Sequence, residues 1–113
     1  MGQSKSLMRY LGRLYGYYPS DPRIAYEVDS LCDGLSDQIG GIATPVFAPE
    51  DKKKEAVKNV FENILPKFIK SIEPKLNNGK KFLFGDRLTI ADFWIGGIYV
   101  NWASNPNIAY GKE

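Results

Sequence analysis

The chain has 113 residues, 43% of them hydrophobic and 25% charged, a composition typical of a soluble globular domain or of part of a larger one. A net charge of +2 is too small to indicate a nucleic-acid or membrane-surface partner, and no uninterrupted apolar run is long enough to cross a membrane. With one cysteine and no histidine, the sequence excludes an internal disulfide, a Cys/His zinc site and a histidine-activated nucleophile, so no metal is expected and a cytoplasmic location fits.

The first predicted helix covers residues 3–14, because apolar side chains recur there at helical spacing: Leu7, Met8, Leu11 and Leu14. Ser4 is the expected N-cap, since a serine hydroxyl can accept a hydrogen bond from a free N–H group of the first turn. Gly16 should end this helix, and Tyr17-Tyr18-Pro19 begins a linker.

A second, longer helix is predicted to begin with Asp21 as N-cap and Pro22 as its first residue, where the missing N–H has no cost. Its apolar stripe includes Cys32, which is therefore expected to be a small core residue. Pro45 should stop this helix after the loosening pair Gly40-Gly41.

Three aspartates lie opposite that stripe at successive i, i+4 positions: Asp29, Asp33 and Asp37. Like charges at this spacing cost about 0.2–0.5 kcal/mol per pair, so something should offset the repulsion. The residues alone leave two interpretations open, a solvated acidic face or a binding surface.

A third long helix is predicted to start at Glu50-Asp51, where acidic residues suit a helix N-terminus. Pro66 should kink it, and Pro74 should kink or break it again. The segment Asn77-Asn78-Gly79 is the expected stop.

The most specific local pattern is at residues 85–102. Thr89 and Asp92 have the spacing of a capping box, and Leu88 and Phe93 have that of a hydrophobic staple. Almost every residue from 93 to 102 is apolar, which predicts a helix buried on all sides in the middle of a bundle. No further helix signal follows Trp102.

The sequence GDRLTIADF at residues 85–93 resembles the G-D-x-L-T-x-A-D-F stretch that opens the sixth helix of cytosolic glutathione transferases. Residues 3–14, with their Gln-Ser pair and R-Y-L triplet, resemble the end of the family's thioredoxin-like domain. Residues 28–37 resemble the fourth helix of its sigma, pi and alpha classes. The resemblance implies an all-α bundle: residues 1–18 would be the third helix of the thioredoxin-like domain, and residues 19–113 the C-terminal helical domain without its last helices.

The resemblance also implies a binding site for glutathione as co-substrate. Gln3 and Ser4 would bind its γ-glutamyl end, and free backbone N–H groups at a helix start do suit a carboxylate. Asp37 would reach across a homodimer to the γ-glutamyl amino group on the partner, with Asp33 at the same interface. No catalytic residue is assigned, because the family's catalytic Tyr, Ser or Cys lies on a strand upstream of Gln3.

Two classes of function follow. The first is a glutathione transferase that conjugates glutathione to small electrophiles in the intact fold; the Gln-Ser pair and the aspartates favour it. The alternative is a transferase-like helical domain for protein–protein assembly. It is favoured because the resemblance begins only near the end of the family's thioredoxin-like domain. A non-catalytic protein that binds ligands in an apolar pocket is a third possibility. In each case the absence of the family's outer parts predicts exposed apolar surface on the first and last helices, and marginal stability or association.

Overall fold

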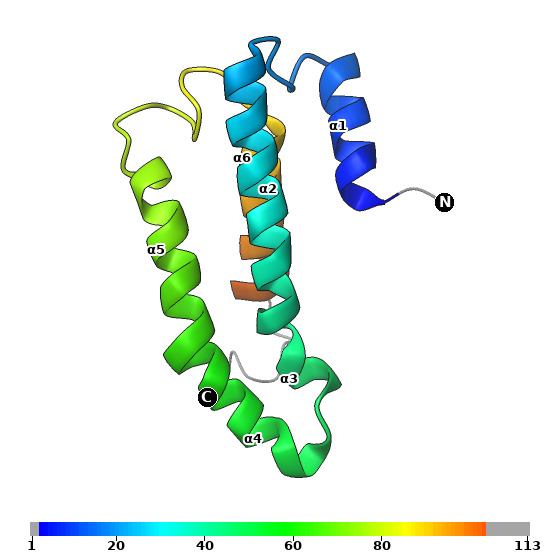
Figure 1. Ribbon diagram of the computed structural model, residues 1–113, viewed down its shortest axis with the longest axis vertical. Coiled ribbons are helices and arrows are strands. Elements are labelled where there is room, and N and C mark those ends of the chain that lie inside the picture. The colour runs from blue at the N-terminus through cyan, green and yellow to red at the C-terminus, as the bar shows by residue number, and fades with distance from the viewer. Residues whose placement is uncertain (1–2, 104–113) are drawn as a thin grey trace.

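The computed structural model describes the backbone of residues 3–103 and the side chains of residues 3–101. Within this range the chain is all-α, as predicted, and contains no strand (Figure 1). The elements in chain order are α1 (Ser4–Leu14), α2 (Pro22–Ile42), α3 (Thr44–Phe47), α4 (Glu50–Asn59), the π-helical turn η1 (Val60–Ile64), α5 (Leu65–Leu76), α6 (Ile90–Ile98) and a second π-helical turn η2 (Tyr99–Ala103).

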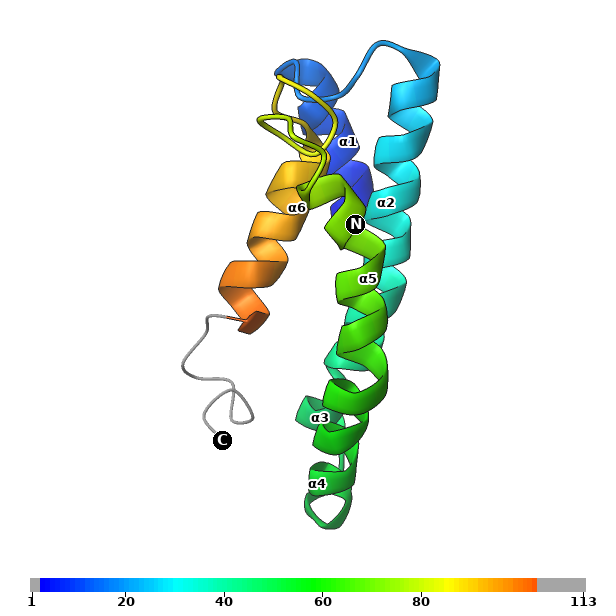
Figure 2. The ribbon, with the colours of Figure 1, turned by 90° about the vertical axis from the view of Figure 1, so that its left-hand side faces the viewer.

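Helix α2 is the axis of the bundle. In Figure 1, α1 and the continuous arm α4–η1–α5 flank it on opposite sides, and the arm runs antiparallel to it. Figure 2 shows α6 beside α2, on the side turned away from the viewer in Figure 1, while the α3–α4 end extends past the end of α6. The predicted pair of long antiparallel helices with the Thr89 helix packed against them is therefore present.

Short-range sequence patterns correctly predicted the start of α2 and the ends of α1 and α5. The Asp21 carboxylate accepts hydrogen bonds from the N–H groups of Arg23 and Ile24 at 2.9 and 3.1 Å, and Pro22 occupies the first helical position. Gly16 and Gly79, which follow the ends of α1 and α5, have φ angles of +78° and +70°, in the left-handed region that favours glycine. These three boundaries agree with the sequence predictions.

The N-cap of α1 was predicted wrongly by one residue. The carbonyl of Gln3 accepts the N–H of Leu7 at 3.0 Å, so Gln3 is the N-cap and Ser4 is the first residue of the helix. No side chain caps the first turn of α1. Its leading N–H groups are consequently available to another acceptor.

Three prolines are accommodated rather than acting as stops. Helix α2 ends at Ile42, and the expected stop Pro45 instead lies in the first turn of α3, where its missing N–H is harmless. Before Pro66, the N–H of Leu65 bonds to the carbonyl of Val60, so a wider π-helical turn leads into the proline. Pro74 lies inside α5, which continues to Leu76.

The predicted capping box of α6 is present. The backbone N–H of Thr89 donates to Asp92 Oδ2 at 2.8 Å, and the other carboxylate oxygen accepts the N–H of Leu83 at 3.0 Å. Asp92 therefore fixes both the helix start and the loop that precedes it.

The prediction that this last helix is buried on all sides is wrong for the described chain. Ile90 and Ala91 are buried, but Phe93 is 50% exposed and Tyr99 is 63% exposed. The reason is that α6 packs mainly against α2 and α1, with Trp94, Ile95 and Ile98 also facing the cluster shared with the arm, and these neighbours leave part of its surface uncovered. Its apolar composition exceeds what the described neighbours bury.

The core consists of two clusters that meet at Leu31, Trp94 and Ile95. One joins α2 to the start of α6 and includes Val28 and Cys32, which confirms Cys32 as a core residue; the other joins α2 to the arm.

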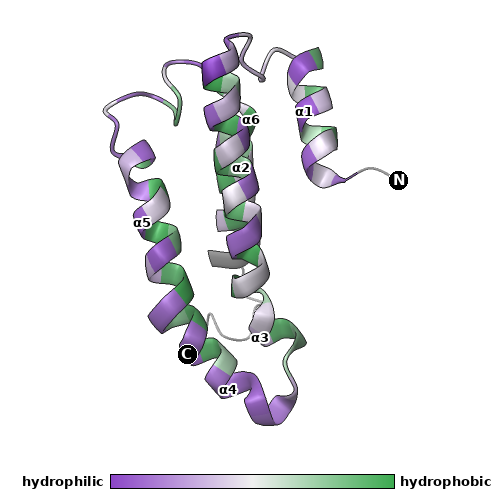
Figure 3. Cartoon of the chain, in the orientation of Figure 1, coloured by the Kyte–Doolittle hydropathy of each residue, from purple (hydrophilic) through white to green (hydrophobic). Residues whose placement is uncertain are grey.

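Hydrophilic residues dominate α4, at the far end of the arm (Figure 3). Among the described helices, none is both long and apolar enough to span a membrane.

Candidate functional site

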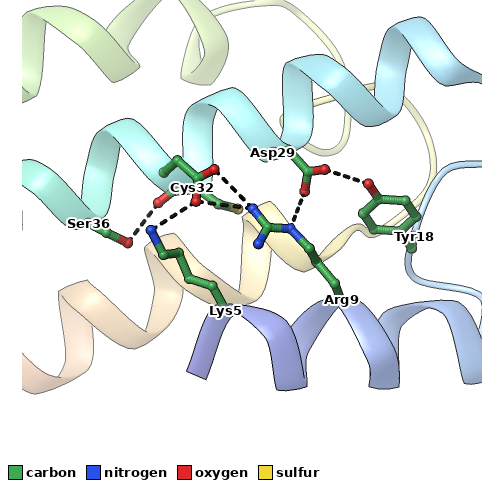
Figure 4. Close-up of polar contacts among 7 residues, drawn as sticks. Lys5, Arg9, Tyr18, Asp29, Cys32 and Ser36 are labelled. Atoms are coloured by element: carbon green, nitrogen blue, oxygen red, sulfur yellow. Dashed lines mark hydrogen bonds and ion pairs between the residues drawn. The ribbon is translucent and has the colours of Figure 1, made fainter. Parts of the chain in front are cut away.

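Helix α1 is joined to α2 by a ladder of charged and polar contacts, shown in Figure 4. Arg9 Nε donates to Asp29 Oδ1 at 2.7 Å, and Arg9 Nη2 donates to both oxygens of Asp33 at 3.0 and 3.1 Å. Lys5 Nζ lies 2.9 Å from Asp33 Oδ1, and the Tyr18 hydroxyl donates to Asp29 Oδ2 at 2.6 Å. Two of the three aspartates on α2 are thus neutralised from within the chain.

The contacts of the ladder shift the ionisation of its members. The hydrogen bond from Lys5, assisted by Arg9, lowers the pKa of Asp33, and the hydrogen bond to Asp29 raises the pKa of Arg9. Burial, followed by the hydrogen bond to Asp29, raises the pKa of Tyr18. For Arg9, Tyr18 and Asp33, each direction favours the protonation state in which the group is paired.

Cys32 lies beneath the ladder in the core, 3% exposed. Burial, together with the negative charge of Asp29, raises the pKa of its thiol to about 11. The reactive form of cysteine is the thiolate, which is therefore scarce at neutral pH. Cys32 is a packing residue and not a nucleophile.

The start of α1 is the most suitable anion site in the described chain. Gln3 and Ser4 are exposed, no acidic residue occupies the first turn, and no side chain caps it. Helix N-termini with free N–H groups attract anions such as carboxylates. Ser4 also lines a cleft of about 400 Å³ between α1, α2 and α6.

Asp37 lies one turn beyond Asp33 on α2 and is exposed. Among the described residues it has no hydrogen-bond or ion-pair partner, whereas Asp29 and Asp33 are both engaged. No contact within the described chain joins it to Gln3 or Ser4. Its carboxylate is therefore available to a group from outside the chain.

Sequence reasoning did not identify the partners of the acidic face. The missed residues are Lys5, Arg9 and Tyr18. Lys5 and Arg9 are spaced i, i+4, the same interval that separates Asp29 from Asp33. Matching this interval between two neighbouring helices could have suggested the pairing.

The family-model match and similar curated proteins agree on one family for this chain. The family model described as "Glutathione S-transferase, C-terminal domain" matches residues 36–109. Glutathione S-transferase P of Pongo abelii is 33% identical over 94 residues, and that of Homo sapiens 32%; each match covers 80% of this chain and 43% of the relative. A glutathione S-transferase of Gallus gallus is 29% identical over 93 residues, covering 81% of this chain and 42% of the relative. The chain thus spans less than half the length of these curated relatives.

Proposed function

This chain belongs to the glutathione S-transferase family, and we propose that it acts as part of a cytoplasmic glutathione transferase that conjugates glutathione to small electrophiles. Residues 1–18 would belong to the domain that carries the catalytic group, and residues 19–113 to the helical domain. The observation that carries the proposal is the uncapped N-terminus of α1, beside Gln3 and Ser4, in a chain of this family.

In this proposal the γ-glutamyl carboxylate binds at the start of α1. It would accept hydrogen bonds from the N–H groups of the first turn and from the Ser4 hydroxyl, whose donors are otherwise in contact with solvent. Gln3 supplies a side-chain amide beside them. A charge-assisted hydrogen bond of this kind contributes roughly twice as much as a neutral one.

The γ-glutamyl ammonium would be bound by Asp37 of a second protomer, as the family resemblance implies. Asp37 suits this role because it is exposed and has no partner in the described chain, whereas Asp29 is held in the ladder. Asp33 would lie at the same interface, with Lys5 and Arg9 keeping it ionised.

The groove between α2 and α5 further supports a homodimer. It has a volume of about 300 Å³, includes Leu31, Gly34 and Leu35, and lies on the same helix as Asp37. Gln38, also in its lining, has a buried amide oxygen with no donor among the described residues. A side chain from a second protomer could fill the groove and donate to this oxygen.

Calorimetric titration of the 113-residue chain with glutathione tests the proposal. We expect saturable binding that weakens about tenfold in Ser4→Ala, the loss expected for one hydrogen bond to a charged group. Ser20→Ala, an exposed serine in the linker, is the matched control and should bind like the parent. No binding by a chain shown to be folded would contradict a glutathione site here and favour the assembly function.

A further inference from the structure

The loop between α5 and α6, residues 77–89, is held closed by the side-chain amide of Asn78. Its Nδ2 group donates to the carbonyl of Leu83 at 2.8 Å and to that of Phe82 at 3.3 Å, and its Oδ1 atom accepts the N–H of Lys80 at 2.8 Å. Because carbonyls only accept and an N–H only donates, these partners fix which end of the amide is nitrogen. A carboxylate at this position could not make the two donor contacts.

Closure of this loop matters for the core, because Leu83 is buried between α2 and α6. Its side chain is 6% exposed and belongs to the cluster that contains Val28 and Ile90. Its backbone is bonded twice, the carbonyl to Asn78 and the N–H to Asp92 Oδ1 at 3.0 Å. Asn78 thus joins the end of α5 to the capping box of α6 through one buried residue.

Asn78 is followed by Gly79, and asparagine in this setting is chemically labile. The backbone nitrogen of Gly79 can attack Cγ of Asn78: a C–N bond forms, the bond from Cγ to Nδ2 breaks, and ammonia leaves with the proton of the Gly79 nitrogen. Water then opens the cyclic imide to aspartate or isoaspartate. A glycine hinders this attack least, because it has no side chain. Its φ angle of +70° shows that the turn ending α5 favours glycine at this position.

We propose that Asn78 is a site of spontaneous deamidation, and that its rate is set by local opening of the loop between α5 and α6. In the closed loop three hydrogen bonds hold the amide in place, so attack by the neighbouring nitrogen requires them to break. Reaction through an open form proceeds in proportion to the population of that form. After deamidation a carboxylate faces two carbonyls, so the loop cannot close as before. The proposal is independent of transferase activity.

Peptide mapping by mass spectrometry, after incubation at mildly alkaline pH, measures the reaction. We expect Asn78 to react at least about tenfold more slowly in the folded chain than in the chain unfolded by urea, the factor that one hydrogen bond contributes. Asn59 and Asn63, which precede valine and isoleucine, are internal controls and should react far more slowly than Asn78 in the unfolded chain. Equal rates in the folded and unfolded chains, or no reaction of Asn78 in either, would overturn the proposal.

Two variants distinguish opening of the loop from unfolding of the whole chain. Asp92→Ala removes the acceptor of the Leu83 N–H and should speed deamidation in native buffer by about tenfold. Arg9→Met breaks the contacts between α1 and α2 but leaves the loop intact, so the rate should hardly change. Equal acceleration in both variants, or none in a folded Asp92→Ala, would overturn control by the loop.

The parent chain offers the same distinction without a substitution. Opening of the loop exposes little surface, so the deamidation rate should be nearly independent of urea below the unfolding transition. A rate that rises with urea as steeply as the population of the unfolded chain would show that global unfolding is required, and would overturn the proposal.

The consequence of the modification is tested with Asn78→Asp, which has the side chain of the aspartate product. It should lower the midpoint of thermal unfolding by roughly 4–8 °C, the shift expected for the loss of one net hydrogen bond. Asn77→Asp is the matched control: it adds the same charge at an exposed residue whose side chain makes no hydrogen bond within the described chain, so its midpoint should change little. Equal shifts in the two variants would overturn the role of the Asn78 amide.

Discussion

At the residue scale, Arg9 has the greatest influence on how α1 is held. Its guanidinium bonds to Asp29 and Asp33 together, and its side chain is 25% exposed, so the pairing is only partly screened by water. Removing it leaves Asp33 paired with Lys5 alone and Asp29 with the Tyr18 hydroxyl as its remaining partner. The ladder adds to the apolar contact that Met8 of α1 makes with the core cluster.

We therefore expect Arg9→Met, which keeps the apolar stem, to lower the free energy of unfolding by about 1–3 kcal/mol. Thermal or urea unfolding followed by circular dichroism measures the change. Arg23→Met is the control, since the Arg23 side chain is 89% exposed and lies 3.8 Å from Glu27 in an i, i+4 pair. Equal losses of unfolding free energy in both variants would show that the ladder stabilises the fold no more than an exposed ion pair does.

The ionisation of Asp33 in the ladder makes the stability of the fold depend on acidic pH. Because pairing lowers the pKa of Asp33 in the folded state, its contribution is present above the unfolded pKa, about 3.9. It is lost as the pH falls through the folded value. Stability measured between pH 6 and 2 should therefore fall less steeply in Asp33→Asn than in the parent, and parallel curves would contradict this.

The buried Cys32 thiol makes the stability of the fold depend on alkaline pH, in the opposite direction to Asp33. Its pKa is raised to about 11 by burial, so it stabilises the fold below its unfolded value and loses that contribution as the pH rises towards 11. At pH 8 the thiol should react with an aromatic disulfide reagent only as fast as the protein unfolds. Rapid reaction of the folded chain would contradict its assignment to the core.

At the element scale, the crossing of α1 and α6 depends on Gly12. A Cβ atom added there would lie 2.5 Å from Cγ2 of Ile90, and the Gly12 carbonyl accepts the N–H groups of Tyr17 and Tyr18 at 2.7 and 3.0 Å. Ile90 in turn donates its N–H to the Tyr17 carbonyl at 3.0 Å. The end of α1, the linker and the start of α6 therefore form one unit.

Gly12→Ala should destabilise the chain by about 1–3 kcal/mol, since it forces a β-branched neighbour to move within a packed crossing. Gly40→Ala is the matched control, because Gly40 lies in an exposed part of α2 with nothing within 4 Å of its added Cβ. That substitution should be neutral or stabilising by up to about 1 kcal/mol. Denaturant unfolding of the two variants compares them directly, and a stabilised Gly12→Ala would disprove the close crossing.

The parts of the fold that the sequence predicted well depend on neighbours a few residues away. The Asp21 cap and the Thr89–Asp92 box are complete within four residues, so their patterns were sufficient. The sequence indicates that Pro66 disturbs the helix, but not that the chain accommodates it with a π-helical turn. That turn packs against α2, where Ile64 would lie 3.0 Å from a Cβ atom added at Gly41.

The parts that could not be predicted depend on distant elements. The exposure of Phe93 is determined by what covers α6, and the ladder by which helix lies beside α2. No periodicity within one helix contains that information. Gln3, Ser4 and Asp37 were chosen from family resemblance, and their roles in binding glutathione stay predictions.

At the scale of the whole molecule, apolar side chains remain exposed along α1, among them Leu7 at 54% and Leu14 at 59%. Phe93 on α6 is exposed as well, and association would remove such apolar area from water. We expect the midpoint of thermal unfolding to rise with protein concentration, as it does when folding is linked to self-association. A midpoint unchanged across a hundredfold range, with a monomer in sedimentation, would contradict this.

The central claim is that two protomers complete each glutathione site, Ser4 from one and Asp37 from the other. Mixing Ser4→Ala chains with Asp37→Ala chains, each of which binds glutathione weakly alone, tests it directly by calorimetry. In the mixed dimer one site regains both groups, so full affinity should return at about one quarter of the sites when exchange is random. A mixture that binds no better than its two parents would contradict a shared site.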